Sequence, residues 1–202
     1  MTRTSSSVPT VAAATLAALT TLAALLLLSP VAASAQGAGA DSERDAGAAR
    51  THAGFWLSGG LGGGLDDAGD GGGGGYLRMG GTLSQHVVIG GDALAWSHEQ
   101  GNATVTRATA TFDVLFYPSI TAGGFLKAGI GFSDLSVSRD IQGVTVSADD
   151  GGAGAVLGAG WDIRLGEGNL YLTPNVDVML QGFDGLDTID AVYLFTIGIG
   201  FH

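Results

Sequence analysis

The stretch that decides the fold is "AVYLFTIGIGFH", residues 191–202. Side chains alternate between the two faces of a β-strand, so residues two apart share a face. Here one alternate set is large and apolar: Tyr193, Phe195, Ile197, Ile199 and Phe201. The residues between them include Thr196, Gly198 and Gly200, which are small. The stretch therefore predicts a strand with one bulky apolar face, and that face needs an apolar surrounding.

Seven other segments with a period of two precede this stretch, separated by turn-rich breaks. Together with it they predict strands over residues 54–65, 75–83, 86–97, 103–117, 124–137, 152–165, 169–182 and 191–201. Glycine occurs 36 times, which favours strands, turns and close backbone packing over helices. In the third segment Trp96 shares its face with Asp92, which suggests a bulge or a shifted register there.

The two faces of these segments differ in a way that predicts lipid outside and a polar lumen inside. In the seventh segment Leu170, Leu172 and Val176 alternate with Asn175 and Asp177. The polar set is rich in glycine and threonine and has few of the lysines and glutamates that coat a soluble protein. Aromatic residues of the apolar set lie near segment ends, as in an interfacial girdle.

The breaks between segments alternate in length and charge. Those after the second, fourth and sixth segments are short, whereas those after the first, third, fifth and seventh are longer and carry most of the acid. Outer-membrane barrels alternate short periplasmic turns with longer external loops in this way. The glycine run within "GGGLDDAGDGGGGG" lacks the Lys-Ser/Thr ending of a phosphate-binding loop and is interpreted as a mobile loop.

The N-terminal region is typical of an exported protein. Arg3 precedes a long uncharged apolar run, and Ala33-Ser34-Ala35 provides the small residues of a signal-peptidase site. We therefore expect a signal peptide over residues 1–35, a flexible leader over 36–53 and a barrel over 54–202; the alternative for the apolar run is a membrane-anchoring helix. Export together with the barrel pattern predicts a place in the bacterial outer membrane.

Over about residues 54–202 the chain resembles the small eight-stranded outer-membrane barrels of the OmpA/OmpX type. The resemblance implies an all-β fold, namely an eight-stranded antiparallel up-and-down transmembrane β-barrel, and we expect the protein to be a monomer. It also implies that the last strand is the recognition signal for the barrel-assembly machinery, carried by Tyr193, Phe195, Ile197, Ile199 and Phe201. His202 departs from the family pattern, in which the aromatic residue comes last. The peptidoglycan-binding domain of longer relatives is not expected.

The polar faces carry four cations and four anions, namely Arg78, Arg107, Lys127, Arg164, Asp92, Asp113, Asp162 and Asp177. The interior of an eight-stranded barrel is just wide enough for side chains to fill it, and buried charges must pair. Turn geometry predicts that Asp113 faces Lys127 and that Arg78 lies near Asp92. We expect a salt-bridged plug; the alternative is a narrow ion path lined by the same charges.

The external breaks contain two groups of acids, Asp66, Asp67 and Asp70 in the first and Asp184, Asp187 and Asp190 in the last. Clustered carboxylates suit hard cations such as calcium, but the calcium-loop signature is incomplete. The plainer interpretation is a set of solvated loop acids. Divalent ions that bridge these acids to lipopolysaccharide phosphates are the alternative.

Several function classes are not expected. The chain has no cysteine and a formal net charge of -11, which excludes thiol chemistry and disfavours nucleic acid as a partner. Ser97 and His98 are adjacent and point to opposite faces, so they do not form a nucleophile–base pair. No enzyme activity, cofactor or metal is expected. The predicted role is structural or surface-interactive, in contact with outer-membrane lipid and lipopolysaccharide; the alternatives are a small pore and a secreted soluble barrel that binds an apolar ligand.

Overall fold

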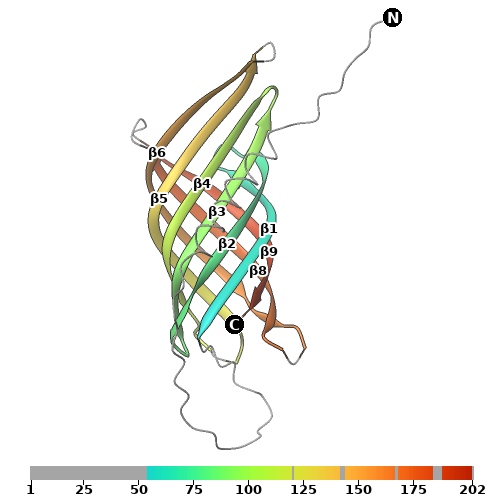
Figure 1. Ribbon diagram of the computed structural model, residues 1–202, viewed down its shortest axis with the longest axis vertical. Coiled ribbons are helices and arrows are strands. Elements are labelled where there is room, and N and C mark those ends of the chain that lie inside the picture. The colour runs from blue at the N-terminus through green and yellow to red at the C-terminus, as the bar shows by residue number, and fades with distance from the viewer. Residues whose placement is uncertain (1–53, 120, 142–143, 167, 184–187, 202) are drawn as a thin grey trace, which may run out of the picture. The chain divides into compact units, whose positions relative to one another are not determined.

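The computed structural model describes residues 54–119, 121–141, 144–166, 168–183 and 188–201. The signal peptide and leader expected over 1–53, and Asp184, Asp187 and His202, lie outside the described residues. The strands are β1 (Phe55–Asp66), β2 (Gly71–Ser84), β3 (Val87–Gln100), β4 (Ala103–Phe116), β5 (Gly124–Ile141), β6 (Val144–Trp161), β7 (Ile163–Arg164), β8 (Leu170–Phe183) and β9 (Ile189–Phe201) (Figure 1). Among the described residues, no helix is long and apolar enough to cross a membrane.

The strands form one closed antiparallel ring. Strands β1 to β6 pair in chain order, β8 pairs with β6, β7 and β9, and β1 pairs with β9. The two-residue β7 continues β6 after Asp162, whose backbone N–H donates to the carbonyl of Gly123, and β7 pairs with β8 as β6 does. The ring therefore has eight strands, and the predicted up-and-down barrel is confirmed. Closure leaves neither sheet edge unpaired along the seam between β1 and β9.

The bulky apolar set of each strand faces outward, as predicted. In β9 the five large alternate residues are between 44% and 63% exposed, whereas Val192, Leu194 and Thr196 on the other face are buried. In β8 the same alternation places Asn175 and Asp177 inside. The barrel is thus inverted relative to a soluble protein, with apolar side chains outside and most polar ones within.

The strands are longer at one end of the barrel than the sequence predicted. Strands β5 and β6 pair as far as Ile141↔Val144, through residues that we expected to form a loop. The glycine run 71–75, expected to be mobile, pairs with β1 over Gly71↔Leu65 to Gly75↔Leu61. Paired backbone groups satisfy one another whatever side chain they carry, so pairing overrides the weak strand propensity of glycine, serine and aspartate here.

Neither the bulge nor the shifted register that the position of Trp96 suggested occurs where β3 pairs with β4. Strand β3 pairs with β4 without a register shift, and Trp96 lies inside the barrel on the same face as Asp92. The nearest irregularity in this hairpin lies between Thr82 and Ser84. The indole fits because Gly72 of the neighbouring strand has no side chain. A Cβ at Gly72 would lie 2.7 Å from the indole ring. A glycine across the strand pair therefore takes the place of a bulge.

Candidate functional site: the filled interior

Four charged side chains meet in the middle of the barrel, and we call them the central charge cluster: Arg78, Asp92, Lys127 and Asp177. Arg78 Nε lies 3.0 Å from Asp92 Oδ2, and Lys127 Nζ lies 2.5 Å from the same oxygen. Lys127 Nζ is also 2.8 Å from Asp177 Oδ1, while Arg78 Nη2 is 3.8 Å from Asp177 Oδ2. None of the four is more than 3% exposed. Strands β2, β3, β5 and β8 each contribute one member.

The strand register and two glycines position these groups. Arg78 and Asp92 are direct partners across the β2–β3 ladder, as the short turn between those strands predicted. Asp177 is the partner of Gly158, and its carboxylate occupies the space that a Cβ on Gly158 would need. The same Cβ would lie 3.1 Å from Lys127 Cε. The absence of a side chain on β6 therefore lets the charges of β5 and β8 meet.

Asp113 lies inside the barrel beside this cluster but is not paired with Lys127 as expected. The register of β4 and β5 matches Asp113 with Gly129 and Leu115 with Lys127, so the two charges are offset by two residues. No ion pair within 4 Å joins them. Both Asp113 carboxylate oxygens are buried without a hydrogen-bond partner in the described part of the chain.

The other three predicted lumen charges lie elsewhere. Asp162 accepts hydrogen bonds of 2.8 Å from Tyr117 Oη and from Thr173 Oγ1. Arg164 is exposed, and its Nε donates to the carbonyl of Gly168 at 3.1 Å. Arg107 pairs with Asp190, one of the expected loop acids, at 2.8 Å. The structure therefore divides the eight charges among several places along the barrel.

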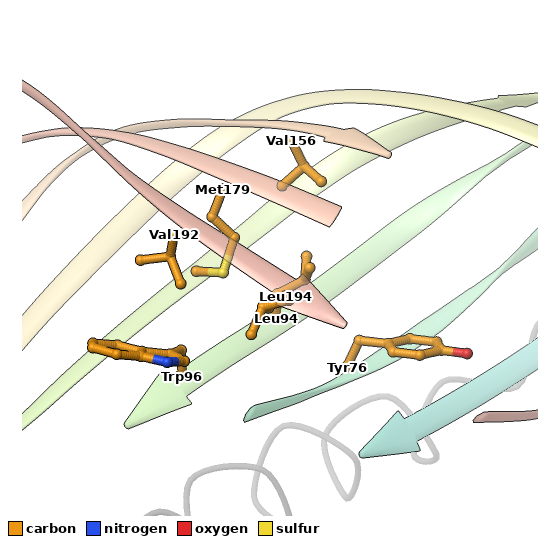
Figure 2. Close-up of a cluster of buried hydrophobic side chains, with 7 residues drawn as sticks. All are labelled: Tyr76, Leu94, Trp96, Val156, Met179, Val192 and Leu194. Carbon is orange, nitrogen blue, oxygen red and sulfur yellow. The ribbon is translucent and has the colours of Figure 1, made fainter. Parts of the chain in front are cut away.

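Two apolar clusters also fill the interior, and sequence reasoning missed both. The outer cluster, shown in Figure 2, consists of Tyr76, Leu94, Trp96, Val156, Met179, Val192 and Leu194. The inner cluster consists of Trp56, Val88, Leu115, Tyr117 and Phe125. All twelve are 4% exposed or less. Along β3, Asp92 lies between Val88 of the inner cluster and Leu94 of the outer one, so the charges are enclosed between two apolar layers.

Arg78 connects the three layers. Its guanidinium carbon lies 4.6 Å from the centroid of the Tyr76 ring in the outer cluster and 5.8 Å from that of Phe125 in the inner one. Cations are attracted to aromatic faces at these distances. The Tyr76 hydroxyl is itself held by a 2.9 Å hydrogen bond with Ser58 Oγ. The central charges are therefore packed against rings on both sides.

The expected loop cation site is only partly covered by the described residues. Asp66 Oδ1 accepts the backbone N–H of Asp70 at 2.8 Å, which closes the turn between β1 and β2. Asp67 is exposed and Asp190 pairs with Arg107. In the part of the chain that the structure describes, no group of three or more acids or histidines could hold a metal ion.

Ser97 and His98 are not arranged as a nucleophile and its base. Ser97 Oγ lies 3.3 Å from Thr106 Oγ1 on the next strand. The His98 ring stacks on Trp96 at a centroid distance of 5.8 Å, and its Nδ1 lies 2.7 Å from the Gly71 carbonyl. The two side chains therefore have different partners, on the two faces of β3.

Comparison with solved structures identifies the fold. Ail, the attachment invasion locus protein of Yersinia pestis, superposes with a TM-score of 0.54 at 14% identity, covering 74% of this chain and 98% of Ail. Neisserial surface protein A gives 0.53 at 12% identity, covering 73% and 96%. The fold is that of the small outer-membrane β-barrels. The predicted resemblance to the OmpA/OmpX type is thus confirmed for the fold.

Ail has also been solved in complex with the heparin analogue sucrose octasulfate, and that structure superposes with a TM-score of 0.52 at 15% identity, covering 74% of this chain and 98% of Ail. No protein-family model matches the sequence. No curated protein matches it significantly either.

Proposed function

We propose that the protein is a non-catalytic β-barrel of the bacterial outer membrane, with a closed lumen and a role at its outer surface. The observation that carries this proposal is the filled interior: a buried charge cluster enclosed between two apolar clusters, inside a wall whose outer face is apolar. Such a barrel offers lipid a hydrocarbon surface and offers solutes no open path.

The outer face supports residence in a membrane. Leu61 and Phe132 are each 80% exposed and Ile130 is 75% exposed, and many other large apolar residues are exposed around the barrel. Soluble monomers rarely expose continuous apolar surface of this extent. A soluble barrel that binds an apolar ligand would need the reverse orientation, so the central charge cluster argues against that alternative. Signal-peptide export and recognition of β9 by the barrel-assembly machinery complete the proposal for its biogenesis.

The interior favours a plug over a pore. A pore needs a continuous polar path, whereas Trp96 and Met179 on one side of the charges and Trp56 and Tyr117 on the other are buried in apolar packing. Interior glycines do not leave that path open, because large side chains from neighbouring strands fill the space beside them. A Cβ on Gly80, for example, would lie 2.8 Å from the Trp56 indole nitrogen.

We therefore expect the purified barrel to give no stable channels in a planar lipid bilayer. The measurement is single-channel conductance on protein that first shows a gel-mobility shift between unheated and boiled samples, which establishes that the barrel is folded. Reproducible unitary conductance steps from the folded form would refute the plug and favour the small-pore alternative.

The outer end of the barrel is acidic, and this constrains what it can bind. The described acids at the end formed by the β1–β2, β3–β4, β5–β6 and β8–β9 connections are Asp66, Asp67, Asp70, Glu99, Asp134, Asp140, Asp149, Asp150 and Asp190, whereas the arginines there are Arg107 and Arg139. Such a surface repels polyanions and attracts cations. Contact with lipopolysaccharide phosphates would then depend on bridging divalent ions, which suits a surface role with cationic partners.

A direct consequence concerns the sulfated sugar bound by Ail. We expect no measurable binding of sucrose octasulfate to this barrel by titration calorimetry at physiological salt, with Ail as the positive control. The reason is like-charge repulsion at the acidic outer end. Saturable binding comparable to that of Ail would contradict the proposed charge preference of the surface.

A further inference from the structure

The middle of the barrel contains one carboxylate more than its cations can balance. Five ionisable side chains lie there, each 3% exposed or less: Arg78 and Lys127 against Asp92, Asp113 and Asp177. Asp92 lies within 3.0 Å of both cations, and Asp177 lies 2.8 Å from Lys127. Asp113 has no cation within 4 Å among the described residues. An unpaired buried charge is costly, so the surplus has to be neutralised.

We propose that Asp113 is a neutral carboxylic acid in the folded barrel and that its proton is bound between Asp113 and Asp92. The interior then holds a proton-binding carboxyl pair, with Asp113 as the donor and Asp92 as the acceptor. This inference is independent of the proposed surface role. No bond is made or broken except that to the proton, which water supplies as the barrel folds.

The unpartnered atoms of the two residues match this arrangement. Both oxygens of Asp113 and the Oδ1 atom of Asp92 are buried without a hydrogen-bond partner in the described structure. Ionised carboxylates only accept hydrogen bonds, whereas a protonated carboxyl also donates one. A proton on Asp113 therefore gives a donor for Asp92 Oδ1, while Asp92 Oδ2 continues to accept from Arg78 and Lys127.

The register places the two carboxyls as neighbours. Asp92 is the direct partner of Thr111 on β4, and Asp113 follows two residues later on the same interior face. Diagonal neighbours of this kind lie close enough to interact across a strand pair. Gly129 of β5 provides the room, because the Asp113 carboxylate occupies the position that its Cβ would take.

Other ways of neutralising Asp113 have less support. Lys127 already forms ion pairs with Asp92 and Asp177. The register of β4 and β5 offsets Lys127 from Asp113 by two residues, and no ion pair within 4 Å joins them. A metal ion would need more ligands, and the described residues contain no group of three or more acids or histidines suited to one. A proton needs only one donor and one acceptor, which the pair supplies.

Infrared spectroscopy of the full-length barrel in lipid at neutral pH tests the proposal. We expect the carbonyl absorption of a protonated carboxyl in the folded wild type and its loss in Asp113→Asn. Absence of this absorption from the folded wild type would overturn the proposal, and so would its persistence in Asp113→Asn. The wild-type measurement decides the question even if the variant does not fold.

The stability of Asp113→Asn gives a second readout. Asparagine has the shape of the neutral acid and its amide can donate to Asp92 Oδ1, so we expect the unfolding equilibrium constant in urea to change by less than about tenfold. A larger destabilisation would show that Asp113 contributes a negative charge. Asp92→Asn is the matched comparison, because it removes a carboxylate that contacts both cations and should destabilise the barrel more.

Discussion

Replacing Lys127 with methionine is expected to destabilise the folded barrel by about 3–5 kcal/mol, the cost of removing one partner from a buried ion cluster. Methionine retains most of the volume but leaves Asp92 and Asp177 with Arg78 alone, and Arg78 Nη2 is 3.8 Å from Asp177. The apolar clusters on either side exclude the water that could solvate the unpaired carboxylate. Urea unfolding in lipid vesicles, followed by tryptophan fluorescence, measures the loss.

Two further variants separate the effect of charge from that of substitution in general. Arg139→Met removes an exposed cation whose Nε lies 3.4 Å from Asn102 Oδ1, and should change stability by less than about 0.5 kcal/mol. The double variant Lys127→Met/Asp177→Asn restores the one-to-one pairing of Arg78 with Asp92 and should recover part of the loss. If Lys127→Met is as stable as wild type, the central charge cluster is not a structural plug.

The barrel could be predicted from the sequence because one face of each strand contacts lipid and the other faces the lumen. Large apolar residues therefore alternate with small or polar ones along the strands. In β9 the alternation of Phe195, Ile197 and Ile199 with small residues identified the outward face correctly. Position along the strand was harder to predict. A shift of two residues keeps a side chain on its face but changes its partner. Asp113 accordingly faces inward as predicted, yet lies opposite Gly129 and not Lys127.

The two apolar clusters, unlike the outward faces of the strands, could not be predicted from the sequence, for a physical reason. Interior residues such as Trp56 and Val156 occur singly among small residues, and β3 and β9 contribute only the pairs Leu94–Trp96 and Val192–Leu194, so no strand shows a continuous apolar interior. The clusters form only when the stagger of the strands around the ring brings residues from several strands to one level. A clue was available in Trp96, whose shared face with Asp92 suggested an irregularity but in fact marked a large residue inside the lumen.

Gly60→Ala is expected to destabilise the barrel by about 3 kcal/mol, because it overpacks the seam where β1 closes the ring against β9. A Cβ on Gly60 would lie 2.6 Å from Tyr76 Cε1, 2.7 Å from Gly198 Cα and 2.9 Å from the Ile197 carbonyl oxygen. The last two are backbone atoms of β9 and cannot move without opening the pairing of Gly60 with Gly198. The expected results are a lower urea midpoint and a smaller fraction of the unheated sample in the fast-migrating folded form.

Gly59→Ala is the matched control, one residue away on the opposite face of β1. Its Cβ would meet the Tyr76 carbonyl oxygen at 3.5 Å and Leu77 Cδ1 at 3.6 Å, which are ordinary contacts. Alanine also loses less backbone entropy than glycine on folding, so this variant should be as stable as wild type or up to about 1 kcal/mol more stable. Equal losses in the two variants would mean that the glycines serve strand flexibility. A loss confined to Gly60→Ala means that an interior glycine is required where the Tyr76 ring and the backbone of β9 leave no room for a side chain.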